Sequence, residues 1–527
     1  MSPPPTAARF AYDAGSGRTL WSLATEWATR RPDEAVIVSL PRLGTPEGME
    51  SLTWQQFVSG VWDLRRQLAA AGVSDQRAVV LALPNSPLAI GIWLAVQSNG
   101  AVITVVDPDG GALAFERVIA ATTPVAVVAD QSNAHAVREA IARSRVDTRL
   151  IVPSSVGADA VRHGIDGLQR SRSEPPSATA DMVAGMLPTS GTSGTPKLVQ
   201  LTHRSYVMAA ERLSRNSGFL TSDRHYLCSP FFHTNGQLYL CAPPFVTGGS
   251  VAVVPRFSAS TYFDAARWSG ATVSSMVAPP MRMALHKAVE RGGAVDPGGL
   301  RLIQYGMNLS ESDWTAWEAC FPQISMRQIY GQTESVTGVL GGAPWEVDDH
   351  ATIGRPFVGV EAVRLVDENG ADVQDAQPGE LWVKGTPGST LMLGYYKAPE
   401  ATAETIVDGG WLRTGDVMVR HPDGRFEFRG RRMHIIRRGG ENLSTYSLEL
   451  DLQSCPLVSD VAVTAKEDDT LDALVVAHVI PAPDYEEVAF REWCRTNLGR
   501  RGVQDEIRLH EDFPRTGSGR VIVRDLA

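Results

Sequence analysis

The chain has 527 residues, of which 43% are hydrophobic and 20% are charged, and its formal net charge at pH 7 is -10. This composition is typical of a globular protein and excludes a disordered chain, while the length predicts at least two domains. The acidic balance argues against nucleic-acid binding over the whole surface, although a local basic patch can still hold a phosphate-bearing ligand.

The cysteines and the N-terminal residues indicate where the protein works. The cysteines form neither a CxxC pattern nor a metal-ligand spacing, which predicts mostly buried thiols in a reducing compartment. Residues 1–5 are polar and proline-rich and lack the pattern of a secretory signal, and no apolar run is long enough to span a bilayer. We therefore expect a cytoplasmic protein that binds neither nucleic acid nor membrane. The five cysteines are Cys228, Cys241, Cys320, Cys455 and Cys494.

Alternating strand and helix patterns begin early in the chain. Residues 76–84 form an apolar strand pattern, residues 88–97 a helical pattern, and residues 101–106 a second apolar strand. Similar strands are predicted at residues 125–129 and 251–254. The strand–helix–strand order predicts parallel sheets covered by helices.

The later part of the chain is richer in strand patterns. The polar residues 169–180 indicate a surface connection, and residues 379–385 (GELWVKG) form a clear alternating strand. A basic cluster at residues 429–438 precedes strand patterns at residues 461–464 and 473–480. These features predict a small α+β module that follows a boundary near residue 431.

A segment rich in glycine and hydroxyl residues lies at residues 187–203 (LPTSGTSGTPKLVQLTH). Glycines let backbone N–H groups converge on an anion, hydroxyls add donors, and Lys197 supplies a compact positive charge. A flexible linker is the alternative interpretation, but the strand pattern at residues 181–187 and the lysine placed after a proline argue against it. The GxxxxGK[ST] spacing of a Walker loop is absent. The residues predicted to bind phosphate are Thr189, Ser190, Gly191, Thr192, Ser193, Gly194 and Lys197.

The segment TSGTSGTPK resembles the phosphate-binding signature of the ANL superfamily, which contains acyl-CoA synthetases, adenylation domains and luciferases. Four more segments resemble the motifs of this family in the same order. On these five motifs the chain is identified as a member, which implies an α/β fold with a large domain of helix-covered sheets and a β-rich subdomain (residues 1–431), followed by a small mobile α+β domain (residues 432–527). The four segments are YGQTE at residues 330–334, TGD at 414–416, Gly430-Arg431 with RGGEN at 438–442, and PRTGSGR at 514–520.

The resemblance implies that ATP activates a carboxylate to an acyl-adenylate, whose acyl group then passes to the thiol of CoA. In YGQTE, Tyr330 and Gly331 would lie against adenine, Thr333 would bind the α-phosphate, and Glu334 would hold Mg²⁺. Asp416 would accept hydrogen bonds from the ribose hydroxyls.

Further nucleotide contacts are implied at two other places. Arg431 would contact the ribose at the domain boundary. Residues 300–309 resemble the adenine-pocket strand and its glycine turn, which consists here of Gly306, Met307 and Asn308. The bulk of Met307 is unusual at this position, and its role stays open.

The segment PFFHTNG at residues 230–236 resembles the part of acyl ligases that borders the acyl pocket and the thiol entry. The resemblance assigns His233 a catalytic role and places Asn235 and Gly236 at the acyl group. Relatives that activate amino acids carry an aspartate in this region, whereas this neighbourhood is aromatic and uncharged. Together with the apolar residues 276–283, it favours a hydrophobic carboxylic acid.

The terminal motif departs from the family. Its last position, a lysine that bridges the carboxylate and the α-phosphate during adenylation, is Arg520 here. A wide planar guanidinium is not equivalent to a slim ammonium at a confined site. The glycine loop that lines the pantetheine channel, Gly439-Gly440, is intact, and Arg437 and Arg438 would pair with CoA phosphates.

These features predict an enzyme that makes acyl-CoA from acyl-adenylate, is impaired in adenylation by Arg520, and receives adenylate from a separate enzyme. The arginine also resembles acyl-CoA ligases of platensimycin- and platencin-type biosynthesis, which implies a bulky diterpenoid acid. Two smaller departures are Met433 at the hinge and Leu198 after the phosphate loop. Three alternatives stay open: an ordinary two-step ligase that uses ATP and Mg²⁺, a non-catalytic protein that binds AMP or acyl-adenylate, and an adenylation domain that loads a carrier protein.

Overall fold

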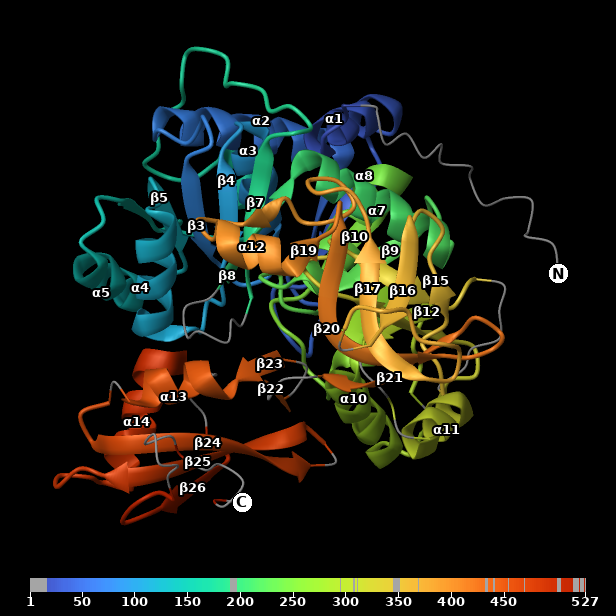
Figure 1. The fold of residues 1–527 in the computed structure, drawn as a ribbon. Coiled ribbons are helices and arrows are strands. Elements are labelled where there is room, and N and C mark those ends of the chain that lie inside the picture. The colour runs from blue at the N-terminus through green and yellow to red at the C-terminus, as the bar shows by residue number, and fades with distance from the viewer. Residues whose placement is uncertain are drawn as a thin grey trace.

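The structure is a computed structural model. It describes residues 17–189, 197–293, 295–306, 309, 311–344, 351–367, 369–431, 435–438, 441–453, 455–468, 470–499, 504–514, 521 and 526. Figure 1 shows a large body of helix-covered sheets and a smaller C-terminal domain beneath it. The predicted α/β architecture is confirmed, while the boundary after residue 431 stays a prediction.

The first sheet of the large domain contains the predicted strand–helix–strand unit. Its strand order among the described residues is β18-β8-β7-β4-β3-β5-β6, and β3, β4 and β5 pair in parallel. The helix α3 between β3 and β4 starts at the N-cap Ser86, whose hydroxyl accepts a bond from the Ala89 N–H, and Pro87 fits the first turn. The bounds are β3 (Ala78–Ala82), α3 (Pro87–Ser98), β4 (Val102–Val105), β5 (Ala126–Ala129), β6 (Arg149–Ile151), β7 (Val183–Thr189), β8 (Lys197–Thr202) and β18 (Gly394–Tyr395).

A second sheet contributes other site segments. Its order in the described part of the chain is β15-β14-β13-β12-β11-β9-β10-β1-β2, with a parallel centre from β1 to β13 and antiparallel strands at both edges. The strands are β1 (Ala35–Ser39), β2 (Glu50–Thr53), β9 (Arg224–Leu227), β10 (Ser250–Val253), β11 (Val273–Val277), β12 (Leu302–Gly306), β13 (Ser325–Gly331), β14 (Gly338–Gly341) and β15 (Arg355–Pro356).

The β-rich part expected after residue 350 forms an antiparallel sheet of order β16-β17-β20-β19, with β21 also paired to β20. Its elements are β16 (Ala362–Val366), β17 (Pro378–Lys384), α12 (Pro399–Thr405), β19 (Ile406–Val407), β20 (Trp411–Arg420) and β21 (Phe426–Arg431).

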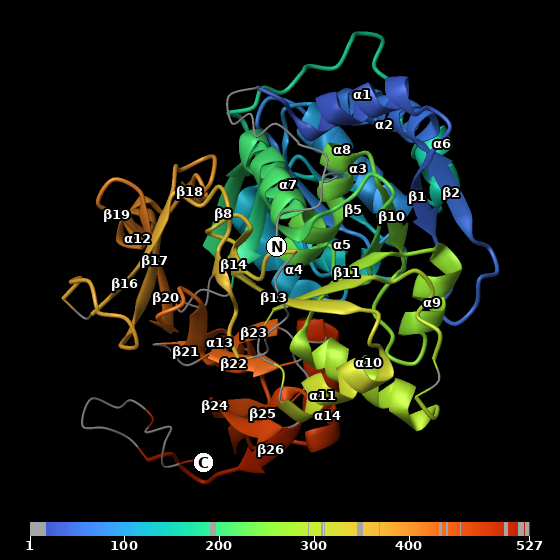
Figure 2. The same ribbon diagram turned by 90° about the vertical axis from the view of Figure 1, so that its right-hand side faces the viewer.

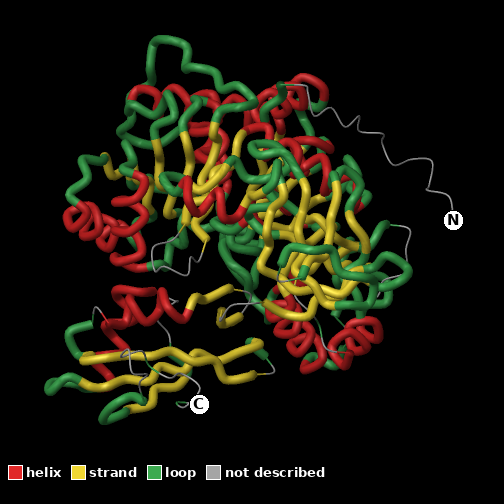
Figure 3. The backbone as a smooth tube through the Cα atoms, viewed as in Figure 1, coloured by secondary structure: helices red, strands yellow, loops and turns green. Residues whose placement is uncertain are grey.

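Helices cover the faces of the two large sheets (Figures 1 and 3). They are α1 (Leu20–Arg30), α2 (Trp54–Ala70), α4 (Gly111–Thr122), α5 (Ala134–Ser144), α6 (Ala158–His163), α7 (His203–Ser217), the π-helix η1 (Asn235–Cys241), α8 (Pro243–Thr247), α9 (Tyr262–Ser269), α10 (Ala278–Glu290) and α11 (Glu311–Cys320). In the described residues, no helix is both long and apolar enough to cross a membrane.

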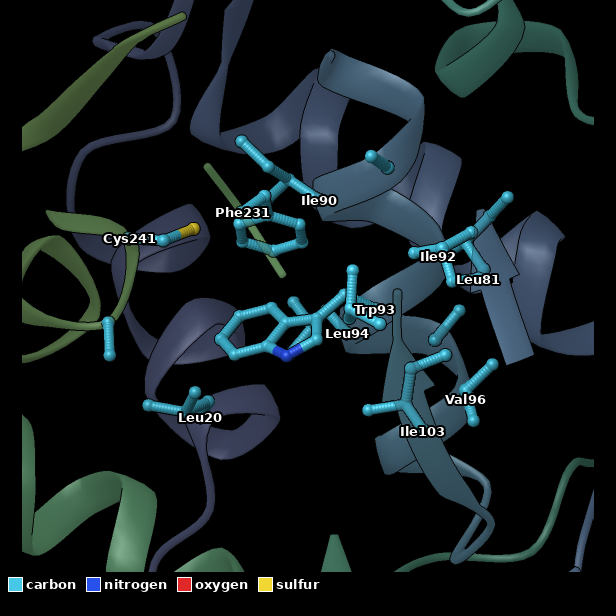
Figure 4. Close-up of a cluster of buried hydrophobic side chains, with 14 of the residues drawn as sticks. Leu20, Leu81, Ile90, Ile92, Trp93, Leu94, Val96, Ile103, Phe231 and Cys241 are labelled. Carbon is cyan, nitrogen blue, oxygen red and sulfur yellow. The ribbon is translucent and has the colours of Figure 1, made fainter. Parts of the chain in front are cut away.

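The largest apolar core lies around Trp93 of α3 (Figure 4). Its ring packs edge-on against Phe231 at a centroid distance of 5.6 Å, and its indole N–H donates to Gln237 Oε1 at 3.0 Å. The hydroxyl of Tyr206 donates to the same oxygen at 3.1 Å. Since buried polar groups need partners, these bonds fix η1 and the segment before it against the first sheet. All five cysteines are free thiols, and all but Cys320 are buried, as predicted.

The C-terminal domain has an apolar core of its own, built around side chains such as Leu452, Val475 and Phe490. Its elements are β22 (Ile435–Arg438), β23 (Glu441–Ser444), α13 (Thr445–Gln453), β24 (Val458–Asp468), β25 (Asp472–Pro481), α14 (Glu487–Leu498) and β26 (Glu506–Leu509). Figures 1 and 2 show the β22–β23 hairpin on the side that faces the large domain, with the β24–β26 sheet farther away.

Two ion pairs join the domains. Arg117 of α4 pairs with Asp451 of α13, and Arg282 of α10 pairs with Asp472 at the start of β25. The Arg282 side chain is 9% exposed, against 31% for Arg117. Gly499 approaches the backbone of Asp109 so closely that any Cβ there would overlap the carbonyl oxygen. The described orientation therefore depends on specific contacts.

We expect Arg282→Ala to increase the rate of trypsin cleavage between the domains roughly tenfold, because loss of a partly buried ionic partner leaves Asp472 unpaired. Timed digestion, followed by mass determination of the two fragments, measures this rate. Arg117→Ala is the matched control and should change the rate by less than about fivefold, since its pair is more exposed. Equal cleavage of Arg282→Ala and the unmodified protein would contradict the expectation.

Candidate functional site

The hairpin of β7 and β8 carries the ends of the predicted phosphate loop. Its antiparallel register places Thr189 opposite Lys197, and the Thr189 hydroxyl donates to the Lys197 carbonyl at 3.2 Å. The two residues that flank the loop are thus held side by side at one end of the first sheet.

Lys197, Tyr395 and Glu334 form a linear arrangement beside this hairpin. The Lys197 ammonium lies 4.8 Å from the centre of the Tyr395 ring, within the range of a cation–π interaction. The Tyr395 hydroxyl donates to Glu334 Oε1 at 2.8 Å. Burial raises the pKa of Tyr395 above its ordinary value, and the nearby charge of Glu334 raises it further, so the phenol stays protonated as a donor.

The YGQTE and TGD segments meet at Asp416, which is 1% exposed. Its Oδ2 accepts hydrogen bonds from the Tyr330 hydroxyl and the Gln332 amide, both at 2.6 Å. Gln332 also donates to the Thr414 carbonyl at 2.8 Å. Donors on both sides fix the carboxylate in a negatively charged, oriented state, which suits recognition of ribose hydroxyls. The register of β20 and β21 places Arg431 opposite Asp416.

The segment that contains His233 lies next to the YGQTE turn. Thr234 and Thr333 share a hydrogen bond between their hydroxyls at 2.9 Å. The His233 N–H donates to the Pro230 carbonyl at 3.2 Å, which closes a tight turn. Gly236 is required in this turn because a Cβ there would lie 2.4 Å from the same carbonyl oxygen.

The side chains of Phe232 and Asn235 complete this region. The rings of Phe232 and His233 lie 4.4 Å apart. The Asn235 amide donates to the Ser275 hydroxyl at 3.0 Å, while its Oδ1 is buried without a hydrogen-bond partner among the described residues. A polar group of a bound molecule could satisfy this oxygen, since burying it unpaired is costly.

Arg438 has its partner within the C-terminal domain. Its guanidinium donates to both carboxylate oxygens of Asp505, with Nε at 2.8 Å from Oδ2. Burial by itself would raise the pKa of Asp505, but the hydrogen bonds from Arg438 and the Val475 N–H hold it below the ordinary value. A role for Arg438 at the CoA phosphates stays a prediction.

The structure brings together residues from four predicted segments. These residues are Thr189, Lys197, His233, Asn235, Gly236, Tyr330, Gly331, Thr333, Glu334, Asp416 and the backbone of Arg431. Gly306 ends β12. Ten predicted residues lie outside the described part of the chain: Ser190, Gly191, Thr192, Ser193, Gly194, Met307, Asn308, Gly439, Gly440 and Arg520. The hinge residue Met433 also lies outside it, and the side chains of Arg431 and Arg437 are not described.

Sequence reasoning missed Gln332, Ser275 and Tyr395. Gln332 occupies the variable position of YGxTE, so its amide was a visible candidate. Ser275 belongs to a buried strand, and Tyr395 lies 61 residues after its partner Glu334. No spacing rule connects such residues, because only sheet pairing brings them together.

The predicted magnesium site was tested against its donors. Within the described residues, no group of three or more His, Cys, Asp or Glu side chains could hold a metal by itself. Mg²⁺ in nucleotide sites is commonly bound by one or two carboxylates, with phosphate and water as the other ligands. A single oriented Glu334 fits this pattern, and the ion would supply positive charge against the phosphates of a bound nucleotide.

Comparisons with known proteins agree with this geometry. Residues 24–396 match the family model of the AMP-binding enzymes, and residues 448–520 match the C-terminal domain of AMP-binding enzymes. A sulfoacetate–CoA ligase of Cupriavidus necator is 30% identical over 95% of this chain and 96% of its own length. A crotonobetaine/carnitine–CoA ligase of Salmonella arizonae is 31% identical over 67% of this chain and 68% of its own length.

Solved structures show the same fold. The o-succinylbenzoate CoA synthetase of Bacillus subtilis, solved as a double mutant with a product analogue, superposes with a TM-score of 0.81 at 20% identity, over 97% of this chain and 98% of its own. The amide bond synthetase of Marinactinospora thermotolerans gives 0.80 at 25% identity, over 97% and 99%. The chain belongs to the AMP-binding enzymes, in the acyl-CoA ligase family of the ANL superfamily, whose members use ATP, Mg²⁺ and CoA.

Proposed function

We propose that this chain is an acyl-CoA ligase that acts through an acyl-adenylate and favours the second half-reaction. In that step the CoA thiol attacks the acyl carbon, the acyl–phosphate bond breaks, and AMP leaves. The observation that carries the proposal is Arg520, which stands where the family has its adenylating lysine, beside an intact Gly439-Gly440 loop. A planar guanidinium does not fit a bridging position shaped for an ammonium.

The arrangement of the C-terminal domain supports this proposal. The β22–β23 hairpin, whose turn contains Gly439 and Gly440 in the sequence, lies on the side that faces the large domain (Figures 1 and 2). Val521, the residue after Arg520, packs with Ala462, Phe513 and Leu526 within the C-terminal domain. An orientation of this kind suits thiol delivery, because it brings the glycine loop rather than the terminal motif toward the nucleotide site.

For the acid, we propose a hydrophobic carboxylic acid, with a bulky diterpenoid acid of natural-product biosynthesis as the first to test. Aromatic side chains flank His233, and the neighbouring segment buries Met276 and Met281. Pockets of this composition favour apolar ligands. The adenylate would come from a separate adenylating enzyme.

The second candidate is an ordinary two-step carboxylate–CoA ligase that uses ATP and Mg²⁺. The sulfoacetate–CoA ligase that matches 95% of the chain favours it, as does the oriented Glu334. A non-catalytic adenylate-binding protein is the remaining alternative, and both differ from the main proposal in what they do with preformed adenylate.

The test supplies a panel of synthetic acyl-adenylates with CoA and no ATP, and follows acyl-CoA by mass spectrometry. We expect acyl-CoA from at least one adenylate, at a rate about 100-fold or more above that of the matching acid with Mg·ATP and CoA. Equal rates by both routes would favour the two-step ligase. If no adenylate yields acyl-CoA while AMP still binds, the chain is a binding protein.

A further inference from the structure

We propose that Tyr395 is a positioning residue that orients Glu334 for Mg²⁺ and keeps it apart from Lys197. Neither residue type nor motif assigned Tyr395 a role. The inference rests on the proposed role of Glu334 as the magnesium ligand, and not on the preference for one half-reaction.

Tyr395 is held from several directions. It is 8% exposed, and its strand β18 pairs antiparallel with β8, which places Tyr395 opposite Val199. The Tyr395 N–H donates to the Thr402 hydroxyl at 2.9 Å. A ring fixed in this way has little freedom to follow a moving carboxylate, so it defines where the carboxylate lies.

The same segment also holds the backbone of Glu334. The Met392 N–H donates to the Glu334 carbonyl at 2.8 Å, and the Tyr395 hydroxyl donates to Oε1 at 2.8 Å. Among the described residues, no hydrogen bond reaches Glu334 Oε2. One carboxylate oxygen is therefore anchored, while the other is available for a cation.

The Tyr395 ring separates two opposite charges. The Lys197 ammonium lies 4.8 Å from its centre, and the hydroxyl at the edge of the ring contacts Glu334. Without the ring, the ammonium and the carboxylate would attract each other directly and form an ion pair. Such a pair would neutralise the cation intended for phosphate and occupy the carboxylate intended for Mg²⁺. The ring holds Lys197 by its negative face and thereby keeps both charges available.

Tyr395→Phe tests the hydroxyl and preserves the ring. Calorimetric titration of a non-hydrolysable ATP analogue over a range of Mg²⁺ concentrations gives the Mg²⁺ level for half-maximal affinity. We expect this level to rise about tenfold in Tyr395→Phe, the equivalent of one hydrogen bond to a charged group. AMP binding without Mg²⁺ should change by less than about twofold. The neighbouring Tyr396→Phe is the matched control and should change neither.

Two results would overturn the inference. One is an unchanged Mg²⁺ requirement in Tyr395→Phe, and the other is an equal loss of AMP and Mg·ATP-analogue affinity, which would indicate general distortion of the site. Glu334→Gln tests the premise, since an unchanged Mg²⁺ requirement there would remove Glu334 as the ligand and the role of Tyr395 with it. Because these titrations need no turnover, their failure is independent of the adenylate and CoA assay.

Discussion

Arg520→Lys is expected to raise the rate of adenylate formation by about 100-fold or more, the range seen when a single well-placed charge donor is removed from an active site. The ammonium of lysine can approach the carboxylate and the α-phosphate together, whereas the guanidinium is wider and planar and needs more room. The increase would correspond to roughly 3 kcal/mol of transition-state stabilisation. Acid-dependent exchange of labelled pyrophosphate into ATP measures the adenylation step alone.

Arg520→Ala is the control for this experiment. If arginine contributes nothing to adenylation, alanine should exchange pyrophosphate at the same low rate as the unmodified chain. Thioester formation from preformed adenylate should stay within about threefold in both variants, since the proposal gives the terminal motif no role in that step. Fast exchange in the unmodified chain, with no gain from lysine, would show that Arg520 adenylates and would favour the ordinary two-step ligase.

Asp416→Ala is expected to weaken AMP binding about 100-fold or more. The carboxylate is 1% exposed and accepts bonds from Tyr330 and Gln332, so its removal loses the ribose contact and leaves two partly buried donors without their acceptor. Each hydrogen bond to a charged group contributes about 1.5–3 kcal/mol. Isothermal titration with AMP gives the affinity, and thermal melting checks that the variant is folded.

Asp416→Asn and Gln332→Ala separate the two causes. Asparagine can still accept from one of the donors but lacks the charge, so it should bind AMP with an affinity between those of alanine and aspartate. Gln332→Ala removes an orienting bond and leaves the carboxylate, and a loss near tenfold is expected. If Asp416→Ala binds AMP as tightly as the unmodified chain, the ribose is held elsewhere.

Local patterns predicted a large part of the fold. The strands at residues 78–82, 102–105 and 126–129, and the helix between the first two, agree with the expected ranges to within two residues at each end. They were predictable because each is short, continuously apolar and bounded by turn residues. The bends of the second sheet and the pairing of β18 with β8 were not predictable, since they depend on strands far apart in the chain.

The sequence by itself determined the family and the residue types of the site, because glycine loops, hydroxyls and fixed charges are written as local motifs. It also contains the substitution at Arg520, from which the proposed half-reaction follows. The tertiary structure alone decided which side chains work together: Tyr330 with Asp416, and Tyr395 with Glu334. The physical reason is distance. Hydrogen bonds and charge–ring contacts act over a few ångströms, and only the pairing of distant strands brings residues 61 to 86 positions apart within that range.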